Sequence, residues 1–306
     1  MDTLTIYMVI STIIGARLGH VLFYEPDRYL SNPIDILKIW EGGLASHGAA
    51  IGILFALWLY ARKKNPGQNY LQTLDRIVIL VALTGALIRL GNFYNSEIIG
   101  KPTNSDYGIV FARHVSEILK SDGTIKEVSY VKNETAQTGT NGSQPVKILL
   151  EFDNMPGNQY SDYSQYMEGR VNAFLTNSPY IREHIYQAGD IDYEVYQDEA
   201  GQYFGIINTY AISRYPAQLY ESFSCVLLFI LLFWIWNKHK EKLPEGRIFG
   251  IFMIILWSLR FVYEFLKENQ VDFENNLPLN MGQILSIPLV LVGIYILVRS
   301  YRNESK

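Results

Sequence analysis

The chain has 306 residues, of which 49% are hydrophobic and 18% charged, and its formal net charge is −4. The apolar residues gather in runs of about 17–20 residues, the length that crosses the ~30 Å hydrocarbon core of a membrane. Six such runs exclude a soluble globular domain. They predict a polytopic α-helical membrane protein.

Six membrane spans are expected in chain order. They lie at 4–23, 48–61, 77–94, 219–236, 248–266 and 282–298. The second is the shortest, and the small residues before His47 allow it to begin earlier.

The loops after the second and fourth spans and the tail after the sixth are rich in Lys and Arg, which places them on the cytoplasmic side. Segment 101–213 then lies outside, and it holds 8 Lys or Arg against 15 Asp or Glu, a net charge of −7. The C-terminus is therefore expected in the cytoplasm. The basic residues are Arg62, Lys63, Lys64, Arg76, Lys238, Lys240, Lys242, Arg247, Arg299, Arg302 and Lys306.

Two segments between the spans are predicted to have structure of their own. Residues 34–40 follow an Asn-Pro turn and predict an amphipathic helix at the membrane interface. Segment 101–213 contains 11 of the 22 tyrosines, β-prone stretches at 146–152 and 193–196, Gly/Asn/Ser turns such as 138–144, and a helical pattern at 169–184. We predict an extracytoplasmic α+β domain at 101–213, between membrane parts at 1–100 and 214–306. Its tyrosines are typical of half-buried strands, and ligand binding is the alternative.

Arg260 is placed inside the membrane by its distance from the inner end of its span. It follows Arg247 by 13 positions, which is ~20 Å along a helix. An arginine near a helix centre costs ~2.5–3.5 kcal/mol on insertion scales. Glu264 lies one turn further and can pair with it. A structural ion pair and an anion site are the two interpretations, and an intramembrane arginine favours the anion site.

Arg89 lies near the outer end of the third span. If the helix continues here, Arg89, Asn92 and Ser96 share one face. Arginine donates to phosphate oxygens in bidentate geometry, so a guanidinium and an amide at headgroup depth fit a phosphodiester. A snorkelling arginine is the alternative, but it leaves the asparagines unexplained.

His47 lies among glycines at the outer boundary of the second span. A neutral histidine suits general-base work near neutral pH. A lone histidine is more often structural. Beside two outward arginines, and without a pattern of metal ligands, catalysis is favoured.

Further polar side chains flank the first and fourth spans. Gln218 and Glu221 are three positions apart and are expected to face the same side. Arg214 precedes them, and Arg17 lies late in the first span. Four arginines at one membrane face predict a site for an anionic lipid. They are Arg17, Arg89, Arg214 and Arg260.

At these positions the sequence resembles the phosphatidylglycerol–prolipoprotein diacylglyceryl transferases, a family of bacterial membrane enzymes. The family signature is Gly-Arg-x-Gly-Asn-Phe-x-Asn-x-Glu followed by a glycine. Here it reads Ile88-Arg89-Leu90-Gly91-Asn92-Phe93-Tyr94-Asn95-Ser96-Glu97, then Gly100. The resemblance covers nearly all of the membrane part in the same order, at 15–24, 40–48, 89–100, 214–221, 260–265 and 281–286.

The resemblance implies that His47, Arg89 and Arg260 are catalytic. It places Asn92, Asn95, Glu97 and Gly100 on the rest of the signature, as substrate-binding residues. Together with the arguments from charge and spacing, the other residues expected to bind the substrate are Arg17, Arg214, Gln218, Glu221 and Glu264.

The implied reaction needs no cofactor and no metal. His47 helps to remove the proton of a lipobox cysteine, the thiolate attacks the terminal glyceryl carbon, and glycerol phosphate leaves. Arg89 and Arg260 hold the phosphate and neutralise its growing charge. The implied partners are phosphatidylglycerol, prolipoprotein signal peptides and membrane lipids, in the bacterial inner membrane, with no nucleic acid.

Four features depart from the family pattern. Its first span, with a functional tyrosine, is absent, and the chain begins Met1-Asp2-Thr3 directly before a span. The leading signature glycine is Ile88, a usual tyrosine is His20, and the outward domain is longer. We expect this chain to be inactive or unstable, because the face of the first span that carries Arg17 would be open to lipid.

Two other classes of function are alternatives. A binding or transport protein for anionic lipids would use the arginines without chemistry, but paired inverted repeats are not found. A structural membrane protein would leave the clusters around His47 and Arg89 without a purpose.

Overall fold

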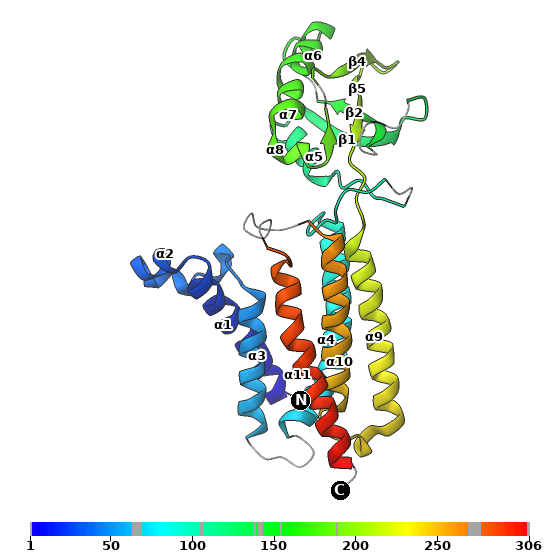
Figure 1. Ribbon diagram of the computed structural model, residues 1–306. Coiled ribbons are helices and arrows are strands. Elements are labelled where there is room, and N and C mark those ends of the chain that lie inside the picture. Colours follow the sequence, from blue (N-terminus) through cyan, green and yellow to red (C-terminus); the bar gives the residue numbers. More distant parts are fainter. Residues whose placement is uncertain are drawn as a thin grey trace. The chain divides into compact units, whose positions relative to one another are not determined.

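The computed structural model describes residues 2–62, 69–104, 107–136, 139, 143–153, 155–187, 189–268 and 277–304. The protein is mostly helical, with one antiparallel sheet formed by residues of segment 101–213 (Figure 1). Lys63, Lys64 and Lys306 of the basic clusters, and part of the predicted turn at 138–144, lie outside the described residues.

Within the described part of the chain, five helical stretches are long and apolar enough to cross a membrane. They confirm a multi-pass membrane protein, and the remaining predicted span, the second in the chain, is a shorter apolar helix of 16 residues, α3 (Ser46–Ala61). The long helices are α1 (Asp2–Phe23), α4 (Tyr70–Tyr94), α9 (Ala217–His239), α10 (Arg247–Tyr263), which continues into η6 (Glu264–Leu266), and α11 (Met281–Glu304).

The expectation that the second span extends back before His47 is wrong beyond Ser46. Gly42 and Gly43 have positive φ angles of 86° and 71°, and Ala45 is extended. The Ala45 amide donates to the carbonyl of Ala16 on α1 instead of to a helical partner. These non-helical backbone conformations prevent α3 from beginning before Ser46.

Contacts divide the chain into two compact units. The first unit comprises Met1–Thr84, Leu227–Trp257 and Pro288–Lys306. The second unit comprises Gly85–Val226 and Ser258–Ile287. Four of the long helices run from one unit into the other.

In the first unit, α1 and α3 pack closely through glycines. A Cβ atom added to Gly15 would lie 2.5 Å from the Gly48 carbonyl oxygen, and one on Gly52 would lie 2.5 Å from that of Ser11. Only glycine allows the two backbones to approach this closely.

Arg17 is enclosed by the segment that follows α1. It is 4% exposed, and its guanidinium donates five hydrogen bonds of 2.5–3.2 Å, which equals its number of N–H donors. The expectation that the Arg17 charge would lack partners and face lipid is therefore wrong. The acceptors are the backbone carbonyls of Asp35, Ile36, Lys38, Gly42 and Gly43.

The predicted interfacial helix at 34–40 is also wrong in form. After the short helix α2 (Pro26–Ser31), the chain makes two 3-10 turns, η1 (Pro33–Leu37) and η2 (Ile39–Glu41). Carbonyls that a continuous helix would use internally, including those of Asp35 and Ile36, accept hydrogen bonds from Arg17. Tertiary contact with one buried cation therefore breaks the helix.

The rest of the first unit has an apolar core between α4, α9 and α10. It contains Val78, Leu228, Leu232, Ile248 and Phe252. Buried Asp75 accepts hydrogen bonds of 2.7 Å from the backbone amides of Gly246 and Phe249, at the start of α10. A carboxylate at a helix N-terminus satisfies amides that have no partner within the helix.

The sheet belongs to the second unit and has the order β1-β2-β5-β3, with β4 also pairing with β5. All pairs are antiparallel. The predicted stretches at 146–152 and 193–196 are confirmed as β2 and β4. The strands are β1 (Ile125–Lys132), β2 (Gln144–Phe152), β3 (Ile185–Tyr186), β4 (Asp192–Gln197) and β5 (Tyr203–Ala211).

Alternate residues of β5 are buried, so one face of the sheet carries the core. Short helices pack on that face, and Figure 1 shows α6, α7 and α8 together beside the strands. Core residues include Ile148, Leu150 and Ile207 from the strands and Met167 and Leu175 from the helices. The prediction of an inserted α+β domain is confirmed.

The helix expected at 169–184 begins earlier and is broken. α6 (Tyr160–Tyr166) continues through the π turn η4 (Met167–Val171) into α7 (Asn172–Asn177), and α8 (Pro179–Arg182) is separate. Ser178 is extended because the residue before a proline avoids the helical region. α5 (Arg113–Leu119) packs on the same core.

His184 is a buried titratable group of this domain. It is 4% exposed, and burial, followed by the nearby charges of Arg214 and His114, lowers its pKa to about 4. Its Nδ1 atom has no hydrogen-bond partner among the residues that the structure describes. The folded domain therefore contains a neutral histidine.

This histidine predicts a loss of domain stability in acid. Between the ordinary histidine pKa of about 6.5 and about 4, the unfolded chain binds a proton that the folded domain does not. Stability is then full above the upper value and falls as the pH drops through this window. His184→Gln should reduce the pH dependence. The measurement is urea unfolding of the intact protein at pH 7 and pH 5, read as protection of β2 and β5 amides in a deuterium pulse at one fixed pH.

The matched control is His239→Gln, which replaces an exposed histidine of the first unit. It should keep the wild-type pH dependence. Equal pH dependence in wild type and His184→Gln would contradict the assignment.

Candidate active site

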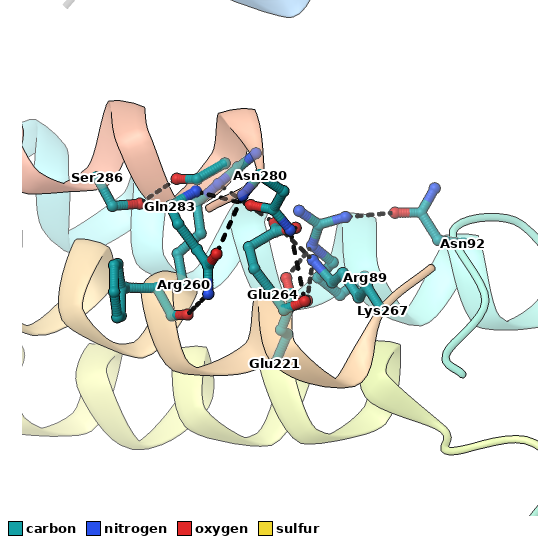
Figure 2. A network of polar contacts seen from close by, with 11 residues as sticks. Arg89, Asn92, Glu221, Arg260, Glu264, Lys267, Asn280, Gln283 and Ser286 are labelled. Atoms are coloured by element: carbon teal, nitrogen blue, oxygen red, sulfur yellow. Dashed lines mark hydrogen bonds and ion pairs between the residues drawn. The ribbon is translucent and has the colours of Figure 1, made fainter. Parts of the chain in front are cut away.

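Five charged side chains of the second unit form one connected group, called here the charge network. They are Arg89, Glu221, Arg260, Glu264 and Lys267 (Figure 2). They come from α4, α9, α10 with η6, and the residue after η6.

Arg89 is held by a carboxylate and an amide. Its Nε atom lies 2.7 Å from Oε2 of Glu221, and its Nη1 donates to Oδ1 of Asn92 at 3.3 Å. Glu221 is nearly buried, in the first two turns of α9. The ion pair fixes the direction of the guanidinium, because a planar fork paired through Nε has little freedom to turn.

Arg260 is the more exposed of the two arginines in the charge network. Its side chain is 39% exposed, and its Nε atom lies 3.7 Å from Oε1 of Glu264. The ion pair that spacing alone predicted is present, but it is long. A partly exposed guanidinium beside a loose ion pair can still receive an anion.

Lys267 joins the two arginine–glutamate pairs. Its Nζ atom forms ion pairs with Glu221 and, at 3.3 Å, with Oε1 of Glu264. The network therefore contains three cations and two carboxylates, a formal excess of one positive charge. An excess of one suits a single bound monoanion such as a phosphodiester.

The start of α11 holds Glu264 from a third direction. Asn280 donates to Oε2 of Glu264 at 3.2 Å, and Asn280 and Gln283 exchange side-chain-to-backbone hydrogen bonds of 2.9 and 3.1 Å. A Cβ atom on Gly282 would lie 2.6 Å from Cδ of Glu264, so a larger residue here would displace the Glu264 carboxylate from its present position.

The signature segment leaves the helix sooner than expected. α4 ends at Tyr94, and Ser96 has a positive φ of 58°, so Ser96 does not share a helix face with Arg89 and Asn92. Asn92 instead donates to Oε2 of Glu97 at 2.9 Å. Glu97 thus supports the Asn92 amide, which in turn accepts from Arg89.

Gln218 and Gly100 position the loop that carries the signature. Gln218 is buried and donates to the carbonyl of Glu97 at 2.7 Å. Gly100 is bridged to Lys267, and a Cβ atom there would overlap the carbonyl of Tyr215. Both residues therefore act on the backbone around the charge network.

Arg214 and Asn95 connect this region with the sheet domain. Arg214 is buried; it donates to the carbonyls of Glu183 and Gly100 and pairs with Glu268 at 2.6 Å. Asn95 accepts a hydrogen bond of 2.7 Å from Arg113. The expected group of four outward arginines is thus reduced to two. The guanidinium groups of Arg17 and Arg214 donate hydrogen bonds to backbone carbonyls of the protein, whereas Arg89 and Arg260 belong to the charge network.

A cavity of about 590 Å³ adjoins the signature loop. Ser96 and Ile98 line it from the loop, and His114, Tyr180 and Glu183 line it from the sheet domain. Ile98 has a φ of 53°, an unfavourable value for a β-branched residue, so this loop is held in a strained conformation.

His47 belongs to the first unit, in the first turn of α3. It is exposed, and its ring lies 5.4 Å from that of Phe23 and 5.7 Å from that of Tyr24. His20, at the position of the usual family tyrosine, stacks on Tyr24 at 5.4 Å. His47 therefore lies in an aromatic group that leaves its imidazole accessible.

Sequence reasoning missed Lys267 and Asn280. Lys267 follows Glu264 by three positions, a spacing that brings side chains together on a helix, and this was the available signal. Asn280 had no such signal, because its contact with Glu264 spans 16 positions.

Comparison with known proteins identifies the family of this chain. The family model for prolipoprotein diacylglyceryl transferase matches residues 1–299. The chain is 32% identical over 306 residues to the phosphatidylglycerol–prolipoprotein diacylglyceryl transferase of Tolumonas auensis, covering 100% of this chain and 81% of that protein. The proteins of the same name from Chloroherpeton thalassium and Porphyromonas gingivalis are 32% and 30% identical, over 97% and 99% of this chain and 75% and 78% of theirs. The chain belongs to the prolipoprotein diacylglyceryl transferase family and is a transferase of lipoprotein biosynthesis.

Proposed function

We propose that this protein transfers the diacylglyceryl group of phosphatidylglycerol to the lipobox cysteine of prolipoproteins, the first step of lipoprotein maturation. The observation that carries the proposal is the charge network. In it Arg89 and Arg260 are linked through Glu221, Lys267 and Glu264, and the five side chains together have an excess of one positive charge. Phosphatidylglycerol has one phosphodiester anion, which matches this excess.

The reaction forms one carbon–sulfur bond and breaks one carbon–oxygen bond. His47 accepts the thiol proton, and the thiolate attacks the terminal glyceryl carbon. The bonding electrons of the broken bond move to the phosphate oxygen, so glycerol phosphate leaves with one more negative charge than the phosphodiester had. Arg89 and Arg260 stabilise that charge as it grows. No cofactor or metal takes part in this scheme.

The remaining site residues support these three. Asn92 and Glu97 orient Arg89, and Glu221 and Glu264 hold the two guanidinium groups. Gln218 and Gly100 shape the signature loop, and Asn95 and Arg214 connect that loop with the sheet domain. Arg17 holds the segment that precedes His47.

The proposed location is the bacterial cytoplasmic membrane. The Lys- and Arg-rich loops and the C-terminus would face the cytoplasm. The acidic segment 101–213 would face outward, on the side from which the lipobox cysteine enters.

A transfer assay tests the function directly. Purified protein in vesicles that contain phosphatidylglycerol should convert a lipobox peptide into its diacylglyceryl thioether and release one glycerol phosphate per peptide. A peptide with Ser in place of the cysteine is the control and should not react. Binding of phosphatidylglycerol without turnover would favour the alternative, an anionic-lipid binding or transport protein.

Lysine in place of either arginine should lower transfer by roughly 100-fold, the scale of losing an oriented donor to a developing anion. A lysine keeps the charge but loses the planar fork. The measurement is kcat/KM of Arg89→Lys and Arg260→Lys with phosphatidylglycerol. Arg182→Lys, far along the chain in the sheet domain, is the matched control and should transfer at the wild-type rate. Near-normal turnover of either variant would make that arginine structural.

A labelling experiment tests the orientation. In a Cys225→Ser background, Lys240→Cys should react with a membrane-impermeant maleimide only from the cytoplasmic side, and Glu199→Cys only from the outer side. Both native residues are exposed. Labelling of Lys240→Cys in intact cells would reverse the proposed topology.

A further inference from the structure

Lys267 is a buried cation at the centre of the charge network. It is 3% exposed and contacts carboxylates from two different elements, Glu221 of α9 and Glu264 of η6. Figure 2 shows its ammonium group between these two glutamates. An isolated buried ammonium is costly, and the two glutamates supply the opposite charges that offset this cost.

The backbone around Lys267 is held on both sides. Lys101 donates to the carbonyl of Leu266 at 2.8 Å, and Gly100 is bridged to Lys267. The amide of Lys267 donates to the carbonyl of Glu264 at 3.4 Å. The lysine is therefore attached to the signature loop as well as to the end of α10.

The contacts imply two consequences of losing the ammonium. Glu221 and Glu264 would each keep only an arginine as a cationic partner in the network, so each carboxylate would draw its arginine more strongly. The formal excess of positive charge would also disappear, since two cations would face two carboxylates. Both effects reduce what the arginines can offer to a phosphate.

We propose that Lys267 is a positioning residue that determines the charge selectivity of the phosphate site, by neutralising Glu221 and Glu264 so that one positive charge remains for the lipid. The proposal rests on the proposed function for the identity of the anion. The ligand class is a phospholipid with a net negative headgroup, and a zwitterionic phospholipid would gain less from the excess charge.

The same excess charge matters during the reaction. When the carbon–oxygen bond breaks, the phosphodiester monoanion becomes a phosphate monoester whose second pKa is about 6. A site with excess positive charge stabilises this change more than it stabilises the bound lipid, which is the condition for a higher rate. Lys267 contributes through Glu221 and Glu264 and does not contact the reacting atoms.

Three variants test the proposal. Lys267→Met removes the charge at similar length, Lys267→Arg keeps it, and the double variant Lys267→Met/Glu264→Gln restores the excess of one. The first readout is kcat/KM and KM for phosphatidylglycerol in transfer. The second needs no turnover: it is the ratio of phosphatidylglycerol to phosphatidylcholine retained by the detergent-solubilised protein, measured by native mass spectrometry.

Lys267→Met should lower both kcat/KM and the lipid ratio by roughly 10-fold or more, the scale of a charge-assisted contact. Lys267→Arg and the double variant should recover most of the lipid ratio. Unchanged lipid selectivity in Lys267→Met, or a loss that the double variant does not recover, would overturn the proposal.

Glu264→Gln alone keeps the test decisive if Lys267→Met does not fold. It raises the excess to two positive charges, so inhibition by added glycerol phosphate should become stronger, and weaker or equal inhibition would contradict the proposal. The two failures are distinguishable. A wild-type protein without transfer, but with the expected selectivity series, would sink the proposed function alone, whereas normal transfer with unaltered selectivity in Lys267→Met would sink this inference alone.

Discussion

The bridge from Lys267 to Glu221 and Glu264 is the interaction on which the arrangement of the site depends. Each glutamate pairs with one of the two arginines, so the lysine makes one network out of two separate ion pairs. A buried carboxylate with no partner is strongly disfavoured, and a network in which each carboxylate meets two cations avoids that cost. The charge that remains is then available to a ligand.

The network also explains why small residues surround it. Gly100 allows the signature loop to lie against Tyr215 and to pair with Lys267, and Gly282 allows α11 to begin directly over Glu264. A side chain at Gly100 would push two backbone segments apart, and one at Gly282 would displace the Glu264 carboxylate. The positions of the charged side chains in this region therefore depend on close approach of the backbone at these two glycines.

The sheet domain is joined to the same region through Arg214 and Asn95, two residues that the sequence predicted to bind the substrate. Arg214 reaches the carbonyls of Glu183 and Gly100, and Arg113 reaches Asn95 beside the signature. A displacement of the sheet domain would therefore shift the signature loop through these hydrogen bonds. The strained Ile98 lies between these two attachments.

Sequence alone determined the membrane class, the long apolar helices, the sheet strands and the family, because these follow from hydrophobic run length, alternation and a contiguous motif. It also placed Arg260 and Glu264 together, since their contact lies within one helical turn. Tertiary structure decided which charges belong together. Arg17 and Arg214 are satisfied by carbonyls up to 114 positions away, and Glu221 meets Lys267 across 46 positions of chain. A hydrogen bond to a distant backbone carbonyl leaves no periodic trace in the sequence, so an arginine used inside the protein and one available to a lipid look the same until the chain is folded.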